Sequence, residues 1–206
     1  MATALLLDVG HVILEPSWRA VRAYESATGT AMPLADEIEL PPDGRWQETS
    51  SGDEVGDRYW DEVARRAGLD GIVGMFRAFG AVVPDAMFNR DAVALMDDAR
   101  AAGLPVGILT NHAHMILGPD WFAARPEFAG LAAFIDAAEV GVPKPDPQAY
   151  LLASEALGVA PADVVFLDDT PACADGATAV GMTGIVVDPR DRRPAFDEAR
   201  RLLGLA

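Results

Sequence analysis

Residues Ala4–Gly10 read Ala-Leu-Leu-Leu-Asp-Val-Gly, a run of four apolar residues that ends at an acidic one. Residues Val164–Asp169 repeat this pattern as Val-Val-Phe-Leu-Asp-Asp, and residues Val106–Asn111 read Val-Gly-Ile-Leu-Thr-Asn. Short, nearly continuous apolar runs are typical of strands that are buried on both faces of a parallel sheet. The three stretches therefore predict core strands that each end at polar side chains.

Outside these stretches, the chain alternates predicted helices with predicted strands. The predicted strands cover residues 4–7, 106–109, 133–136, 164–167 and 183–187, and the predicted helices cover residues 18–28, 55–67, 72–79, 89–102, 147–157, 172–180 and 194–203. The connections have the lengths that parallel crossovers need. The predicted fold class is therefore α/β, with a doubly wound parallel sheet.

The segment of residues 15–88 contains predicted helices but no convincing strand, and part of it is rich in turn-forming residues. A helical segment that interrupts an α/β pattern after its first strand favours an insertion into one core. We expect residues 1–14 and 89–206 to form the α/β core and residues 15–88 to form a small helical cap.

The composition limits the kinds of partner. The 206 residues include 32 acidic and 16 basic ones, for a net charge of −16, which argues against a basic face for nucleic acid or an anionic membrane. The single cysteine, Cys173, has no partner for an internal disulfide, which predicts a reducing compartment, the cytoplasm. No apolar run is long enough to span a bilayer, and the first residues lack the basic flank of a signal peptide.

Polar residues whose side chains can bind a ligand or take part in a reaction follow four of the predicted strands. They are Asp8, Thr110 with Asn111, Lys144 in a Val-Pro-Lys-Pro segment, and Asp168 with Asp169. In open parallel sheets, ligands bind in the crevice outside the carboxyl ends of the strands. These side chains are therefore expected to converge on one site.

The residue types in this set match phosphoryl transfer. Clustered carboxylates repel one another and need a cation, and oxygen ligands suit Mg²⁺. A carboxylate can also attack phosphorus to form an aspartyl-phosphate. The hydroxyl of Thr110 and the ammonium of Lys144 can hold the oxygens of the transferring group.

Four stretches resemble the sequence motifs of the haloacid dehalogenase superfamily of hydrolases: residues 8–12, 108–111, 141–150 and 164–169. Their order and spacing match, and the similarity covers nearly the whole chain apart from the insertion. The resemblance is to phosphatases with a small helical cap, including sugar-phosphate phosphatases and the N-terminal domain of soluble epoxide hydrolases. It implies a Mg²⁺-dependent hydrolase of small phosphomonoesters. We expect the protein to be a monomer or a homodimer.

The resemblance also implies roles for individual residues. Asp8 would be the nucleophile and a Mg²⁺ ligand, together with the backbone carbonyl of Gly10 and the side chain of Asp169, and Asp168 would support the metal. Thr110, the backbone at Asn111, and Lys144 would bind the phosphoryl group. His11, beside the nucleophile, is also expected to contact the substrate.

One position departs from the motif. Many phosphatases of this superfamily have a second aspartate, the general acid, where this chain has Gly10. General acid–base help is worth roughly 10²–10⁴-fold in rate. Three explanations stay open. The first is a leaving group that needs little protonation, as in an anomeric sugar phosphate or an acyl phosphate. The second is that another side chain takes the place of the acid, with His11 the nearest. The third is that the reaction is not that of a phosphatase.

Two alternative functions follow from these departures. Haloacid dehalogenases of the superfamily also lack the second aspartate, attack carbon and need no metal, but the pair Asp168–Asp169 counts against that chemistry. Cys173 stands where related phosphatases often have Asn or Asp, which predicts weaker metal binding. A non-catalytic binding or regulatory protein on the same scaffold is the second alternative.

Overall fold

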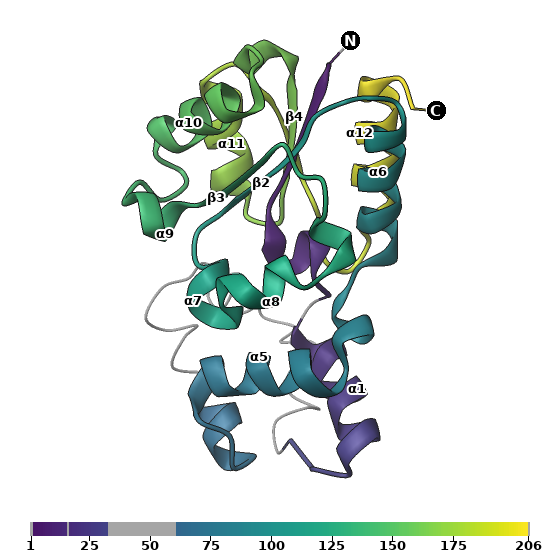
Figure 1. Ribbon diagram of the computed structural model, residues 1–206, viewed down its shortest axis with the longest axis vertical. Helices are drawn as coiled ribbons and strands as arrows, with labels where there is room; N and C mark the ends of the chain where they lie inside the picture. The colour runs from purple at the N-terminus through teal and green to yellow at the C-terminus, as the bar shows by residue number, and fades with distance from the viewer. Residues whose placement is uncertain (1, 16, 33–60, 206) are drawn as a thin grey trace.

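The computed structural model describes residues 2–15, 17–32 and 61–205. Its five strands form one parallel sheet in the order β3-β2-β1-β4-β5 (Figure 1). The strands are β1 (Ala4–Leu7), β2 (Val106–Thr110), β3 (Ala133–Asp136), β4 (Val164–Asp168) and β5 (Thr183–Val186). The predicted doubly wound α/β fold is confirmed, with the first strand of the chain at the centre of the sheet.

The central strands are apolar throughout because both faces of the sheet are covered. In β1, Leu5 and Leu7 belong to one hydrophobic cluster, whereas Leu6 belongs to the cluster on the opposite face. Strand β4 divides in the same way, with Leu167 in the first cluster and Phe166 in the second. Every residue of β1 and β4 is buried, as expected for strands in the middle of a two-sided sheet.

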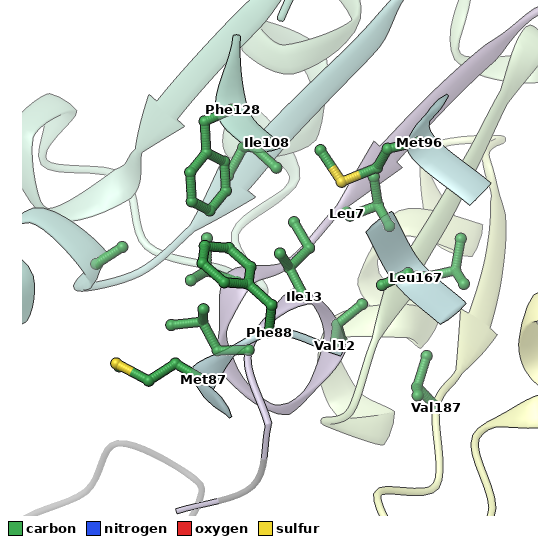
Figure 2. Packing of buried hydrophobic residues seen from close by; sticks show 14 of the residues in the cluster. Leu7, Val12, Ile13, Met87, Phe88, Met96, Ile108, Phe128, Leu167 and Val187 are labelled. Atoms are coloured by element: carbon green, nitrogen blue, oxygen red, sulfur yellow. The ribbon is translucent and has the colours of Figure 1, made fainter. Parts of the chain in front are cut away.

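Helices pack on the two faces of this sheet (Figure 1). Helices α6 (Arg90–Ala101) and α12 (Arg193–Leu203) contact each other on one face, and α10 (Pro147–Leu157) and α11 (Pro171–Ala179) contact each other on the other. Figure 2 shows the first face from close by, where Met96 of α6 lies near Leu7 and where Ile108 and Leu167 also point into the cluster.

Helical elements fill the described part of the segment between β1 and α6. They are the π-type turn η1 (Val9–Ile13), α1 (Ser17–Thr28), a helical stretch at 61–66, α5 (Gly71–Val82) and the short helix η2 (Pro84–Met87). A single antiparallel bridge between Leu14 and Phe88 joins the two ends of the segment. The predicted cap boundaries at residues 15 and 88 stay a prediction, and residues 55–60 of the predicted helix at 55–67 lie outside the described part of the chain.

The structure also contains short elements that the sequence patterns do not predict. Besides η1 and η2, they are α7 (Ala113–Leu117), α8 (Pro119–Ala123), η3 (Pro126–Phe128), α9 (Ala137–Val140) and η4 (Pro161–Asp163). Each has five residues or fewer, too few to display a 3.6-residue period. None of the helices described within residues 2–15, 17–32 and 61–205 has the length and apolar character needed to span a bilayer.

Candidate active site

A cavity of about 570 Å³ lies at the carboxyl ends of the strands, between the sheet and helices α5 and α7. Figure 1 shows these two helices below the tip of β1. The described residues that line the cavity include all eight site residues expected from the sequence: Asp8, Gly10, His11, Thr110, Asn111, Lys144, Asp168 and Asp169. Parallel strands thus bring together four segments that are far apart in the chain.

The turn after β1 determines where Asp8 points. The backbone N–H of Asp8 donates to the carbonyl of Leu167 at 2.9 Å, which ties the residue to the neighbouring strand β4. The chain then bends through Gly10 and His11, and His11 has a φ of +53°. A positive φ is uncommon for a residue other than glycine. The bend keeps both residues at the rim of the cavity that Asp8 faces.

Lys144 forms the electrostatic centre of the cavity. Its Nζ donates to Asp8 Oδ1 at 2.8 Å and to Asp168 Oδ2 at 2.6 Å. It also lies 5.3 Å from the centre of the Phe166 ring, and its side chain is only 3% exposed. Burial alone would lower the pKa of Lys144, but the negative charges of Asp168 and Asp8 outweigh that effect and hold the pKa above its usual value. The amine is therefore an ammonium at neutral pH.

Asn111 holds the segment that carries this lysine. Its Oδ1 accepts the backbone N–H of Lys144 at 2.8 Å, and its Nδ2 donates to the Lys144 carbonyl at 3.2 Å. The side chain of Asn111 therefore fixes the lysine segment, and Asn111 itself lines the cavity. Thr110, the last residue of β2, is buried beside it.

Three carboxylates gather next to the lysine. Asp8, Asp168 and Asp169 each offer one oxygen, and these oxygens all lie within 4.8 Å of one another. Burial raises the pKa of Asp168, and the charge of Asp8 adds to the rise, whereas the Lys144 ammonium opposes it. Such an all-oxygen set fits a hard divalent cation such as Mg²⁺.

Individual contacts hold two of these carboxylates in place. Asp168 Oδ1 accepts the backbone N–H of Thr170 at 2.8 Å, and Asp169 Oδ2 lies 2.9 Å from His11 Nδ1. His11 therefore contacts a carboxylate of the acidic cluster directly, which its place in the sequence does not reveal. Asp175, two residues beyond Cys173, is exposed and does not line the cavity.

The opposite wall of the cavity is apolar, and the sequence motifs do not predict it. Its described members are Leu14, Ile72 and Phe76 of α5, Ile116 and Leu117 of α7, and Phe122 of α8. The helix of residues 72–79 is predicted from the sequence, but its place beside a cavity is not. The sequence signal from α7 is the apolar run at 115–117, which follows the segment His-Ala-His. His112 lines the cavity, whereas His114 stacks on Phe134 with ring centres 4.7 Å apart and contacts Glu139 at 2.9 Å.

Cys173 also lines the cavity, where it is buried near the carboxylates. Burial, followed by the charge of Asp168, raises the pKa of Cys173 to about 12. Only the thiolate reacts rapidly with alkylating agents. We expect iodoacetamide at pH 8 to label the native protein at least about tenfold more slowly than the protein unfolded in guanidinium chloride. Equal labelling rates in the two states would contradict the buried, protonated thiol.

Comparisons with known proteins agree with this geometry. A model of the family described as haloacid dehalogenase-like hydrolase matches residues 4–181. Phosphatase MT3486 of Mycobacterium tuberculosis is 33% identical over 135 residues, which are 66% of this chain and 56% of that protein. Hexitol phosphatase A of Escherichia coli is 34% identical over 115 residues, which are 54% of this chain and 51% of that protein. The matched segments thus span about half the length of these curated relatives.

Solved structures share the fold at low sequence identity. A HAD phosphatase from Thermococcus onnurineus has a TM-score of 0.63 and 20% identity, with 98% of each chain covered. The structure of a dehalogenase has a TM-score of 0.65 and 19% identity, with 98% of this chain and 97% of that chain covered. The family match extends over most of the chain and includes all four segments that meet at the cavity. This chain therefore belongs to the haloacid dehalogenase-like hydrolase family.

Proposed function

We propose that the protein is a Mg²⁺-dependent phosphatase that hydrolyses small phosphomonoesters through an aspartyl-phosphate on Asp8. One observation carries the proposal: a buried ammonium, Lys144, bridges Asp8 and Asp168 beside a third carboxylate, Asp169. A cation in this place attracts a phosphoryl group towards the oxygen that would attack it. The printed names of the two relatives from M. tuberculosis and E. coli, both phosphatases, add support.

In the first step, a carboxylate oxygen of Asp8 attacks phosphorus, and the bond from phosphorus to the leaving-group oxygen breaks. The electron pair of that bond goes to the leaving oxygen, which then takes a proton from water. Lys144 Nζ binds Asp8 Oδ1, so Oδ2, which faces Gly10, is the oxygen free to attack. Thr110, the backbone at Asn111, and the Lys144 ammonium would hold the other phosphoryl oxygens.

In the second step, water attacks the phosphorus of the aspartyl-phosphate, Asp8 is released as a carboxylate, and phosphate leaves with the remaining proton going to solvent. Asp8, Asp169 and the backbone carbonyl of Gly10 would hold Mg²⁺, with Asp168 in support. When bound, the ion neutralises charge on the carboxylates and on the phosphoryl group.

The segment of residues 15–88 is proposed to act as the cap that covers the cavity. Its described helix α5 contributes Ile72 and Phe76 to the wall opposite the carboxylates. A cover of this kind excludes water and contacts the part of the substrate that is not phosphate. The cytoplasm remains the predicted compartment, and a monomer or homodimer the predicted assembly.

The test is phosphate release from a panel of phosphomonoesters that includes hexose 1-phosphates, with Mg²⁺ or with EDTA. We expect hydrolysis of at least one member, slowed roughly 100-fold or more by the chelator and restored by added Mg²⁺. Halide release from 2-chloropropionate by the EDTA-treated protein would instead support the dehalogenase alternative. Phosphate release that ignores the chelator would contradict the proposed mechanism.

A further inference from the structure

Building on the proposed phosphatase function, we propose that the preferred substrate is an aryl phosphate, whose leaving group is flat and apolar and departs as a weakly basic oxygen. Two independent features support this substrate class. One is the set of groups beside the attacking oxygen of Asp8, and the other is the chemistry of the opposite cavity wall.

The first feature is that the position beside the nucleophile carries no acid. Gly10 faces Asp8, and a Cβ built on it would lie 3.5 Å from Asp8 Oδ2. The position thus has room for a side chain and has an ordinary φ of −63°. The absence of a carboxyl group at this place is a property of the sequence and is not imposed by the backbone.

The described neighbours of this position are engaged elsewhere. His11 directs its Nδ1 at Asp169, at 2.9 Å. The Lys144 ammonium donates two of its three N–H groups to carboxylates at 2.8 and 2.6 Å, and the negative charge of these carboxylates keeps the amine protonated. A substrate whose leaving oxygen is weakly basic avoids the need for a donor, because the bond to phosphorus breaks without prior protonation.

The second feature is the apolar wall that faces the leaving group. Ile72 and Phe76 of α5 and Ile116 and Leu117 of α7 line the same cavity, and the two helices contact each other. A hydroxyl-rich sugar placed there would lose its hydrogen bonds with water and gain few from these side chains. An aromatic ring would instead bury apolar surface against them, which is favourable.

Glu15, an acidic residue that also lines the cavity, does not change the preference for an apolar leaving group. Its carboxylate accepts from Arg192 at 3.1 Å on one oxygen and from Arg19 at 3.1 Å on the other. Its charge is therefore already paired. Among the described residues, His112 is a further polar group that lines the cavity.

The reaction balances without a protein acid. Asp8 Oδ2 forms a bond to phosphorus as the aryl–oxygen bond to phosphorus breaks, and the electron pair leaves on the aryl oxide. The aryl oxide takes its proton from water after departure. Hydrolysis of the aspartyl-phosphate then yields phosphate and restores the Asp8 carboxylate.

The experiment measures kcat/KM in Mg²⁺ for 4-nitrophenyl phosphate, phenyl phosphate, glycerol 2-phosphate and glucose 1-phosphate. We use kcat/KM because it reports the first chemical step even when hydrolysis of the intermediate limits turnover. We expect 4-nitrophenyl phosphate to exceed phenyl phosphate at least about tenfold, and phenyl phosphate to exceed both polar substrates at least about tenfold. The variant Gly10→Asp should reduce the ratio between the two aryl phosphates to nearly one.

A pair of variants on α5 tests the wall. Ile72→Asn should lower kcat/KM for phenyl phosphate roughly tenfold relative to the value for glucose 1-phosphate. Val82→Asn, at the exposed end of the same helix and outside the cavity, should leave that ratio unchanged.

Higher kcat/KM for glucose 1-phosphate than for phenyl phosphate would overturn the substrate class while leaving the proposed phosphatase function intact. A second pair of results would also overturn the substrate class. The natural protein would hydrolyse the two aryl phosphates with equal kcat/KM, and His112→Asn would lower kcat/KM for phenyl phosphate alone, because His112 would then be the general acid. Failure to hydrolyse any phosphomonoester would instead overturn the proposed function.

Discussion

Replacing Asp8 with asparagine should lower kcat for phosphomonoester hydrolysis by roughly 10⁴-fold or more. The amide keeps the size of the side chain, but it has no anionic oxygen to attack phosphorus. Asp8 Oδ1 is held at 2.8 Å from Lys144, in the cavity that also contains Thr110. The loss should therefore be in the chemical step, with KM changed far less than kcat.

A matched substitution at Asp136 controls for the general effect of removing a strand-end carboxylate. Asp136 is buried at the end of β3, where it accepts the backbone N–H groups of His114 and Ala138, and it does not line the cavity. Asp136→Asn should keep kcat within a few-fold of the natural protein. Hydrolysis by a folded Asp8→Asn protein at rates near those of Asp136→Asn would contradict the role of Asp8.

Replacing Lys144 with methionine should destabilise the metal-free protein by about 3–5 kcal/mol. Methionine matches the length of the lysine stem but leaves Asp8 and Asp168 facing each other without the ammonium between them. Removing one partner of a buried ion pair is costly because an uncompensated charge stays in the interior. Urea unfolding in EDTA, followed by circular dichroism, measures the difference in the free energy of unfolding.

A double variant shows whether charge is the cause. In Lys144→Met/Asp168→Asn, one of the two facing carboxylates becomes neutral, so the protein should be more stable than Lys144→Met alone. Packing loss would give a different result, because the second substitution would then add to the first or leave it unchanged. A double variant no more stable than the single one would contradict the electrostatic account of Lys144.

Much of the sheet could be predicted because each central strand is a short apolar run that can be recognised from its own residues. Residues 4–7 and 164–167 are apolar without interruption, since β1 and β4 are covered on both faces. The meeting of the polar side chains at the strand ends was predictable for the same reason. Once the sheet is parallel, Asp8, Thr110 and Asp169 must lie at the same edge of it. Thr110 and Asp168 prove to be the last residues of their strands, one position later than the patterns indicate.

The contacts that hold the site together could not be predicted in this way. The pairing of Asn111 with the backbone of Lys144 joins residues 33 positions apart, and the contact of His11 with Asp169 joins residues 158 positions apart. No period or motif encodes such distances, because they depend on how the loops after the strands fold. The part of the apolar wall that α7 and α8 supply escaped prediction because these helices have only five residues each.

The most direct test of the central claim is to find where the phosphoryl group goes. The protein is mixed in excess with 4-nitrophenyl phosphate and Mg²⁺, quenched in acid within milliseconds, digested, and analysed by mass spectrometry. The account predicts that the peptide containing Asp8 gains the mass of one phosphoryl group during turnover and that Asp8→Asn abolishes the gain. Rapid release of phosphate with no phosphorylated Asp8 at any quench time would contradict it.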